Sequence, residues 1–136
     1  MVGVIIVAHD KLADAFYNSM EMIIGHQENI ETLSINSIDN FEMAKKNLRL
    51  AINRVNTGHG VIILTDMFGG TPSNLSLSFL KEEEVEVVTG INLPMLIKLS
   101  ELRKKLKLDA LKKELCLYGR EKIIAASDLL NHCNHT

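Results

Sequence analysis

The sequence predicts an α/β protein with a doubly wound, mainly parallel open sheet and helices on both faces. Two apolar runs rich in Val and Ile, residues 2–8 and 61–65, have the length and composition of strands that are buried on both sides. Helical patterns follow them, and further strand and helix patterns alternate along the chain. This alternation is typical of parallel strands joined by right-handed crossovers. We expect the flavodoxin-like strand order 2-1-3-4.

The composition is that of one globular domain over residues 1–136, with a flexible tail expected at 131–136. The formal net charge of −2, without a basic cluster joined to aromatic residues, argues against a nucleic-acid partner. No apolar run approaches the ~20 residues that span a bilayer, and no signal-peptide pattern opens the chain, so we expect no membrane insertion and a cytoplasmic location. Cys116 and Cys133 fit a reducing compartment.

The first strand is followed by a predicted helix over residues 10–25, because apolar residues recur there at helical spacing. Residues 30–35 alternate weakly and predict a second strand. Asp39 and Glu42 have the spacing of a capping box, which predicts the start of a second helix that ends near Gly58.

The strand over residues 61–65 leads directly into a turn with two glycines, residues 66–74. Thr71 and Pro72 suit the N-cap and first position of a helix. Residues 75–79 alternate with a period of two and fit a strand as well. We predict a helix, because the Thr-Pro pair opens one and a parallel sheet needs a crossover here.

A fourth strand is predicted over residues 85–89, followed by helices that begin at Pro94 and after Asp109. Gly119 is expected to end the last of these helices. The apolar pair within residues 122–126 is too short to assign and fits an edge strand or one more helical turn.

His9 ends the first strand and Asp66 follows the third, so the predicted strand order places both at adjacent carboxyl ends. Ligands bind at this edge of open α/β sheets. A carboxylate beside an imidazole fixes its tautomer and leaves the other ring nitrogen with a free lone pair. A single histidine at a strand end is more often a capping or packing residue, but its coincidence with Asp66 favours a nucleophilic site.

The turn after Asp66 has the features of an anion-binding loop. Gly69 and Gly70 expose backbone N–H groups, Thr71 supplies a hydroxyl, and a helix begins at Pro72. A phosphoryl group fits this arrangement.

Four separated segments resemble the enzyme IIA component of the mannose-type (mannose/fructose/sorbose) sugar phosphotransferase system. They are the opening Gly3-Val-Ile-Ile-Val-Ala-His9, the turn Asp66-Met-Phe-Gly-Gly-Thr-Pro72, Gly90-Ile-Asn-Leu-Pro-Met95 and Gly119-Arg-Glu121. They occur in the same order and span essentially the whole chain.

The resemblance implies that His9 carries a phosphoryl group in this phosphoenolpyruvate-dependent system. It would accept the group from the histidine-containing phosphocarrier protein and pass it to a IIB component. Asp66 matches the carboxylate that orients the histidine, and Thr71 matches the residue that hydrogen-bonds the phosphoryl group, within a binding turn of Phe68, Gly69, Gly70 and Pro72. The resemblance also implies a homodimer with an exchanged C-terminal strand, here residues 122–126.

Two residues depart from the family pattern. Asp10 stands where the family often has glycine, and its charge should modestly disfavour a phosphoryl group on His9. Phe68 stands where some members carry tryptophan.

Other functions stay open at this stage. A receiver-like domain would use Asp66 itself as phosphoacceptor, although the sequence lacks the acidic pair of such a metal site. A phosphoryl donor subunit of a dihydroxyacetone kinase, a regulator that senses phosphorylation state, and a binding module without turnover are further alternatives. The sequence does not identify the sugar or regulatory target.

Neither a cofactor nor a metal is expected. His26 and His59 are interpreted as solvated residues. His132, Cys133 and His135 have ligand chemistry, but three groups on a tail are weak evidence for zinc, which normally needs four positioned ligands. The charged runs at residues 81–84 and 103–107 are interpreted as solvated faces or rims of a partner surface.

Overall fold

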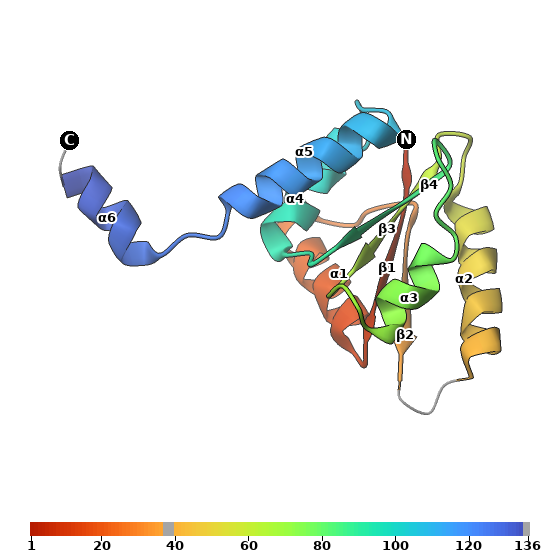
Figure 1. Cartoon of the computed structure of the whole chain (residues 1–136). Coiled ribbons are helices and arrows are strands. Elements are labelled where there is room, and N and C mark those ends of the chain that lie inside the picture. Colours follow the sequence, from red (N-terminus) through yellow and green to blue (C-terminus); the bar gives the residue numbers. More distant parts are fainter. Residues whose placement is uncertain (37–39, 135–136) are drawn as a thin grey trace.

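The computed structural model describes residues 1–36 and 40–134 (Figure 1). Its β-strands are β1 (Gly3–His9), β2 (Ile30–Ile35), β3 (Val61–Thr65) and β4 (Val85–Thr89). Its helices are α1 (Leu12–Ile24), α2 (Phe41–Val55), α3 (Thr71–Leu77), α4 (Leu93–Leu102), α5 (Leu108–Glu121) and α6 (Ala126–Asn134).

The described strands form one parallel sheet in the order β2-β1-β3-β4, which confirms the predicted fold class and strand order. β1 lies between β2 and β3, with Val7 opposite Leu33 on one side and Thr65 on the other. Parallel strands covered on both faces need apolar residues at every position, and residues 4–8 of β1 are fully buried.

Helices cover both faces of the sheet. One apolar cluster joins Val4, Ile6 and Ala8 of β1 with buried residues of α1, α4 and α5. The other joins Ile5 and Val7 with buried residues of α2 and α3. Since side chains alternate along a strand, His9 follows Val7 onto the face that α2 and α3 cover.

Two helix starts differ from the predicted caps. Asp39 lies outside the described residues, and the N-cap of α2 is Asn40, whose side chain accepts hydrogen bonds from the backbone N–H groups of Glu42 (2.9 Å) and Met43 (3.3 Å). α3 starts one residue earlier than predicted, with Gly70 as N-cap, so Thr71 and Pro72 are its first residues. The strand alternative for residues 75–79 is wrong, because α3 extends to Leu77.

The predicted end of α5 at Gly119 is wrong, because the helix continues to Glu121. Gly119 is buried against Met95 of α4, and a Cβ at this position would collide with the Met95 side chain. The two helices also share a polar link. The side chain of Asn92, the N-cap of α4, accepts from Met95 N–H (3.0 Å) and donates to the Gly119 carbonyl (3.1 Å). Gly119 therefore permits close helix packing rather than a helix stop.

Residues 122–126 form neither an edge strand nor a continuation of α5 within this chain. Lys122 is the C-cap of α5, residues 123–125 have no regular structure, and α6 begins at Ala126. Figure 1 shows α6 well away from the sheet at the end of this connection. Part of the tail expected from residue 131 falls within α6, whose bounds reach Asn134.

Candidate functional site

His9 and Asp66 lie together at the carboxyl edge of the sheet. His9 is the last residue of β1, and Asp66 directly follows β3, the neighbouring strand. The apolar run of each strand fixes its position, and the polar residue at its end emerges at the same edge. The sequence-predicted pair is therefore brought together.

His9 contacts the Asp66 carboxylate through its ring and through its backbone N–H. His9 Nδ1 lies 2.7 Å from Asp66 Oδ2, and the backbone N–H of His9 donates to the same oxygen over 3.0 Å. The backbone N–H of Met67 donates to Oδ1 of Asp66 over 3.0 Å. Since both carboxylate oxygens are engaged, the carboxylate has a fixed orientation toward the ring.

The electrostatics favour an ionised Asp66. Burial, with 9% of its side chain exposed, opposes ionisation, but the hydrogen bonds and charge of His9 outweigh it and lower the pKa of the Asp66 carboxyl. A carboxylate that accepts from Nδ1 keeps the proton on that nitrogen. The Nε2 lone pair is then free to act as a nucleophile, on a side chain that is 45% exposed.

Gly70 lies close to the Cε1–Nε2 edge of the His9 imidazole. A Cβ at residue 70 would lie 2.7 Å from His9 Cε1 and 3.0 Å from Nε2. Its φ of −88° is open to any residue, so close approach to the ring, not backbone conformation, calls for glycine here. Sequence reasoning placed Gly70 in an anion-binding loop but missed this contact, which no spacing pattern reveals.

The remaining turn residues differ in backbone conformation and in exposure. Gly69 has a φ of +93°, which favours glycine. Thr71 is exposed and begins α3, whereas Pro72 is buried beneath it. Phe68 is 72% exposed, and its neighbour Met67 is exposed too.

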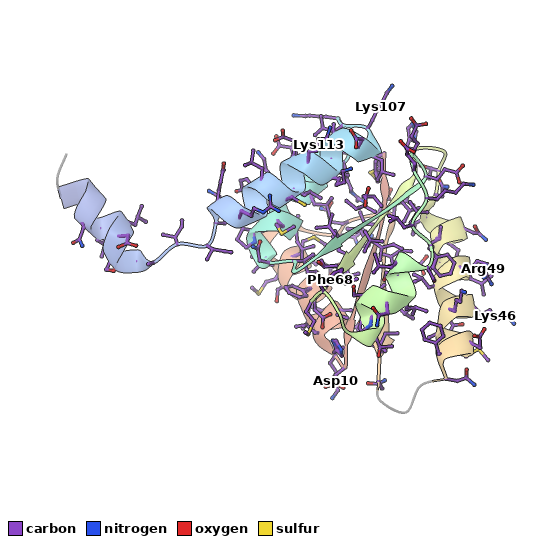
Figure 2. The ribbon with its side chains drawn as sticks, viewed as in Figure 1. Asp10, Lys46, Arg49, Phe68, Lys107 and Lys113 are labelled. Atoms are coloured by element: carbon purple, nitrogen blue, oxygen red, sulfur yellow. The ribbon has the colours of Figure 1, made fainter. Side chains whose placement is uncertain are left out.

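Asp10 adopts a left-handed backbone conformation, with a φ of +51°. Only glycine enters this region freely, whereas Asp and Asn enter it more readily than other residues. The structure thus explains why glycine suits this position, next to the histidine. Figure 2 shows Asp10 at the end of the molecule opposite Lys107, with Phe68 between these two residues.

The other expectations concern sites away from this edge. Among the residues that the structure describes, no three His, Cys, Asp or Glu side chains are grouped to hold a metal ion. The side chains of His132, Cys133 and His135 lie outside the described part. Within residues 1–36 and 40–134, no helix combines the length and apolar character needed to cross a membrane.

The fold and the site define an α/β domain with a partly exposed histidine, held by a carboxylate, at the edge between two parallel strands. Residues 3–116 match the family model EIIA-man, described as the PTS system fructose IIA component. The chain belongs to this family, the mannose-type IIA components of the sugar phosphotransferase system.

Several characterised proteins share this similarity. The chain is 29% identical over 131 residues to the PTS system fructose-specific EIIA component of Bacillus subtilis, covering 96% of this chain and 90% of that protein. It is 33% identical over 98 residues to the sorbose-specific EIIA component of Lacticaseibacillus casei, covering 71% of this chain and 70% of that protein. Its match to the mannose-specific EIIAB component of Escherichia coli covers only 30% of that longer protein.

Solved structures agree with this assignment. Phosphotransferase system component EIIA from Streptococcus agalactiae superposes with a TM-score of 0.85 at 27% identity, covering 94% of this chain and 99% of that one. The PTS IIA protein associated with the fucose utilization operon of Streptococcus pneumoniae gives a TM-score of 0.80 at 25% identity, covering 96% and 99%.

Proposed function

We propose that this protein is a phosphoryl carrier in which His9 Nε2 accepts a phosphoryl group from the histidine-containing phosphocarrier protein and passes it to a IIB component. The observation that carries the proposal is the 2.7 Å contact between His9 Nδ1 and Asp66 Oδ2, which leaves Nε2 as the free nucleophile. Membership in a phosphotransferase family supports it. The cytoplasm, where the phosphocarrier and the IIB component act, is the location that this role implies.

The transfer is an exchange of one nitrogen–phosphorus bond for another. The Nε2 lone pair forms a bond to phosphorus while the bond to the carrier's ring nitrogen breaks, and that nitrogen keeps the electron pair. The His9 ring gains positive charge as the bond forms, and the Asp66 carboxylate at Nδ1 stabilises it. Gly69, Gly70 and the Thr71 hydroxyl would hold the phosphoryl oxygens, in a reaction governed mainly by positioning and electrostatics.

Incubation with the phosphorylated phosphocarrier protein, followed by intact-mass measurement and peptide mapping, tests the proposal. We expect one phosphoryl group on the peptide that contains His9. The bond should be labile to acid and stable to alkali. An alkali-labile phosphoryl group on Asp66 would support the receiver-like alternative instead, and no transfer at all would favour a binding module without turnover.

Gly70→Ala should slow phosphorylation of His9 while the protein stays folded. The added Cβ would approach Cε1 and Nε2 too closely, so the ring must turn away from its position. We expect a loss of roughly tenfold to a hundredfold in rate, because small displacements of reacting groups have effects of this size. Initial rates with the phosphorylated carrier measure it.

Gly69→Ala is the matched control for this prediction. Nothing lies within 4 Å of a Cβ at residue 69, but its positive φ makes the substitution strained. It should lower the free energy of unfolding by about 1 kcal/mol with a smaller effect on the rate. Equal rates for Gly70→Ala and the natural protein would contradict the assigned contact.

Asp10→Asn should raise the phosphorylated fraction at equilibrium with the carrier by roughly twofold to fivefold, since it removes a negative charge beside the dianionic phosphoryl group. Asparagine keeps a side chain that tolerates the φ of +51°. Asp10→Gly removes the same charge and also frees the backbone, so it should shift the fraction equally. An unchanged fraction in both variants would mean that Asp10 does not influence the site.

We also propose a homodimer in which residues 122–126 of one copy lie against the other copy. Ile123 and Ile124 are 80% and 52% exposed, and Leu129 and Leu130 of α6 are 51% and 62% exposed. β4 is an edge strand of the described sheet, so an exchanged strand could pair with it. The exposure of these apolar side chains, in the segment after α5 that lies away from the sheet, is explained if a second copy of the chain covers them.

Light scattering after size-exclusion chromatography tests the dimer. The full chain should give twice its mass of 15.2 kDa, and a variant truncated after Glu121 should give the monomer mass. Ile123→Asp with Ile124→Asp should have the same effect as the truncation. A monomeric full chain at micromolar concentration would refute the dimer without affecting the proposed role of His9.

A further inference from the structure

A cavity lies at the opposite edge of the sheet from His9. Its volume is about 480 Å³, and it is bordered by the residues before β1 and β3 and by the connection from α4 to α5. Figure 2 shows Lys107, which lines it, at the far end of the molecule from Asp10. The phosphoryl transfer proposed for His9 uses none of these residues.

Cationic side chains dominate this cavity. Its lining includes Arg103, Lys104, Lys105 and Lys107, together with His59. They belong to the charged run at residues 103–107, for which the sequence alone favours a solvated face or the rim of a partner surface. Like charges so close together repel each other, and a concave wall of one sign concentrates anions.

The acidic residues of the cavity offset only part of this charge. Asp109 is already engaged by Lys112 (3.0 Å) and Lys113 (3.1 Å), outside the lining. Glu83 is the other carboxylate in the lining. Among the basic residues, Lys105 lies 3.4 Å from Glu101, whereas no ion pair involves Lys104 or Lys107 within the described residues.

Arg103 adds a buried positive charge. It is 1% exposed, and its terminal NH groups donate to the backbone carbonyls of Asn29 (3.2 Å) and Glu28. Its Nε–H has no hydrogen-bond partner in the described part of the chain, and burial lowers the pKa of the guanidinium. The charge of Glu28 favours this cation in part, but no carboxylate of the described residues lies at ion-pair distance, so the guanidinium gains from an anion nearby.

The start of α5 faces the same cavity. Its N-cap is Lys107, whose side chain cannot accept a hydrogen bond, and no side chain of the described residues caps the helix. Lys107, Leu108 and Asp109 all line the cavity. The first N–H groups of this helix and its dipole therefore add to the positive potential of the lysines.

We propose that this cavity is a binding site for a small organic phosphate, separate from the phosphoryl site at His9. The volume suits a sugar phosphate or a mononucleotide. Phosphate oxygens would bind Lys104, Lys107 and the start of α5, and the organic part would contact Leu106, the half-buried apolar residue of the lining. A concave site favours a compact ligand over an extended polyanion.

Titration of the isotopically labelled protein, followed by amide chemical shifts, tests this site. The probes are glucose 6-phosphate, AMP and sodium pyrophosphate, with sodium chloride at matched ionic strength as control. At least one of the two organic probes should give saturable shifts at Gly58–Gly60 and at residues 104–111, with submillimolar affinity. Lys104→Gln with Lys107→Gln should weaken binding about tenfold, since each lysine would make a charge-assisted hydrogen bond.

Matched variants distinguish binding in this cavity from a general effect of charge and from binding at His9. Lys45→Gln with Lys46→Gln changes the net charge equally on α2 and should leave the affinity unchanged. His9→Ala should also leave it unchanged, so failure of the phosphoryl-carrier role would not affect the result. Amide shifts that do not saturate with the probe, or that sodium chloride alone reproduces, would overturn the proposal. So would shifts centred on residues 66–71, and so would binding of the protein to anionic phospholipid vesicles without binding of the soluble probes.

Discussion

His9→Ala is expected to abolish phosphorylation by the phosphorylated carrier protein, with the mass of the variant unchanged after incubation. The reason is chemical, because no other described residue at this edge of the sheet supplies a free imidazole lone pair, and Asp66 is held by two backbone N–H groups and the ring. His9 is 45% exposed, so removing its ring leaves the buried part of β1 intact and the protein folded. Intact-mass measurement after incubation, with circular dichroism for the fold, checks both parts.

The other histidines provide matched controls. His26 and His59 lie outside the site, in connections that precede β2 and β3. His26→Ala and His59→Ala should therefore accept a phosphoryl group at the natural rate. A phosphoryl group of full occupancy on the His9→Ala variant would overturn the assigned nucleophile, and peptide mapping would then identify the residue that carries it.

The strands could be predicted from the sequence because strands buried on both faces consist almost entirely of apolar residues. Residues 4–8 and 61–65 are covered on both faces, and only apolar residues with Thr65 occupy these positions. Helix starts were less predictable, since several neighbouring residues suit the N-cap position. Asn40 is the N-cap of α2, where Asp39 was predicted, and Gly70 is the N-cap of α3, where Thr71 was predicted. Tertiary packing overrode local preference at Gly119, which Met95 contacts within the last turns of α5.

At the site, the pairing of His9 with Asp66 could be predicted from the expected strand order. His9 and Asp66 are 57 residues apart, and only the strand order makes them neighbours. Once the order is known, their pairing follows from position alone. The contact of Gly70 with the ring and the positive φ of Asp10 depend on the path of the backbone at single residues. No periodic pattern carries that information. Residues 122–126 were ambiguous for another reason, which the proposed dimer explains, because the contacts of this segment would lie in a second copy.

Asp66→Ala should slow phosphoryl transfer to His9 by roughly 10²- to 10⁴-fold while the protein stays folded. Without the carboxylate, Nδ1 loses its acceptor at 2.7 Å, so the ring is free to rotate and to place its proton on Nε2. The positive charge that develops on the ring also loses its nearest negative partner. Single-turnover rates with the phosphorylated carrier measure the effect. A rate within threefold of the natural protein would show that Asp66 does not orient the nucleophile.

Asp66→Asn tests the need for two carboxylate oxygens and their charge, and the pH dependence of stability provides a second readout. Both oxygens of Asp66 are engaged, Oδ2 by the His9 ring and backbone N–H and Oδ1 by the Met67 N–H, whereas asparagine has only one acceptor oxygen. We therefore expect Asp66→Asn to slow transfer as well, because an NH₂ group placed toward Nδ1 favours the tautomer with the proton on Nε2. The folded-state pKa of Asp66 is lowered, so its stabilising effect is fully present above the unfolded pKa and is lost as pH falls through the folded value. At neutral pH, Asp66→Ala should therefore lower the free energy of unfolding by about 1–2 kcal/mol. That difference from the natural protein should shrink below about pH 4, where the carboxylate becomes protonated in the unfolded chain and then in the folded one.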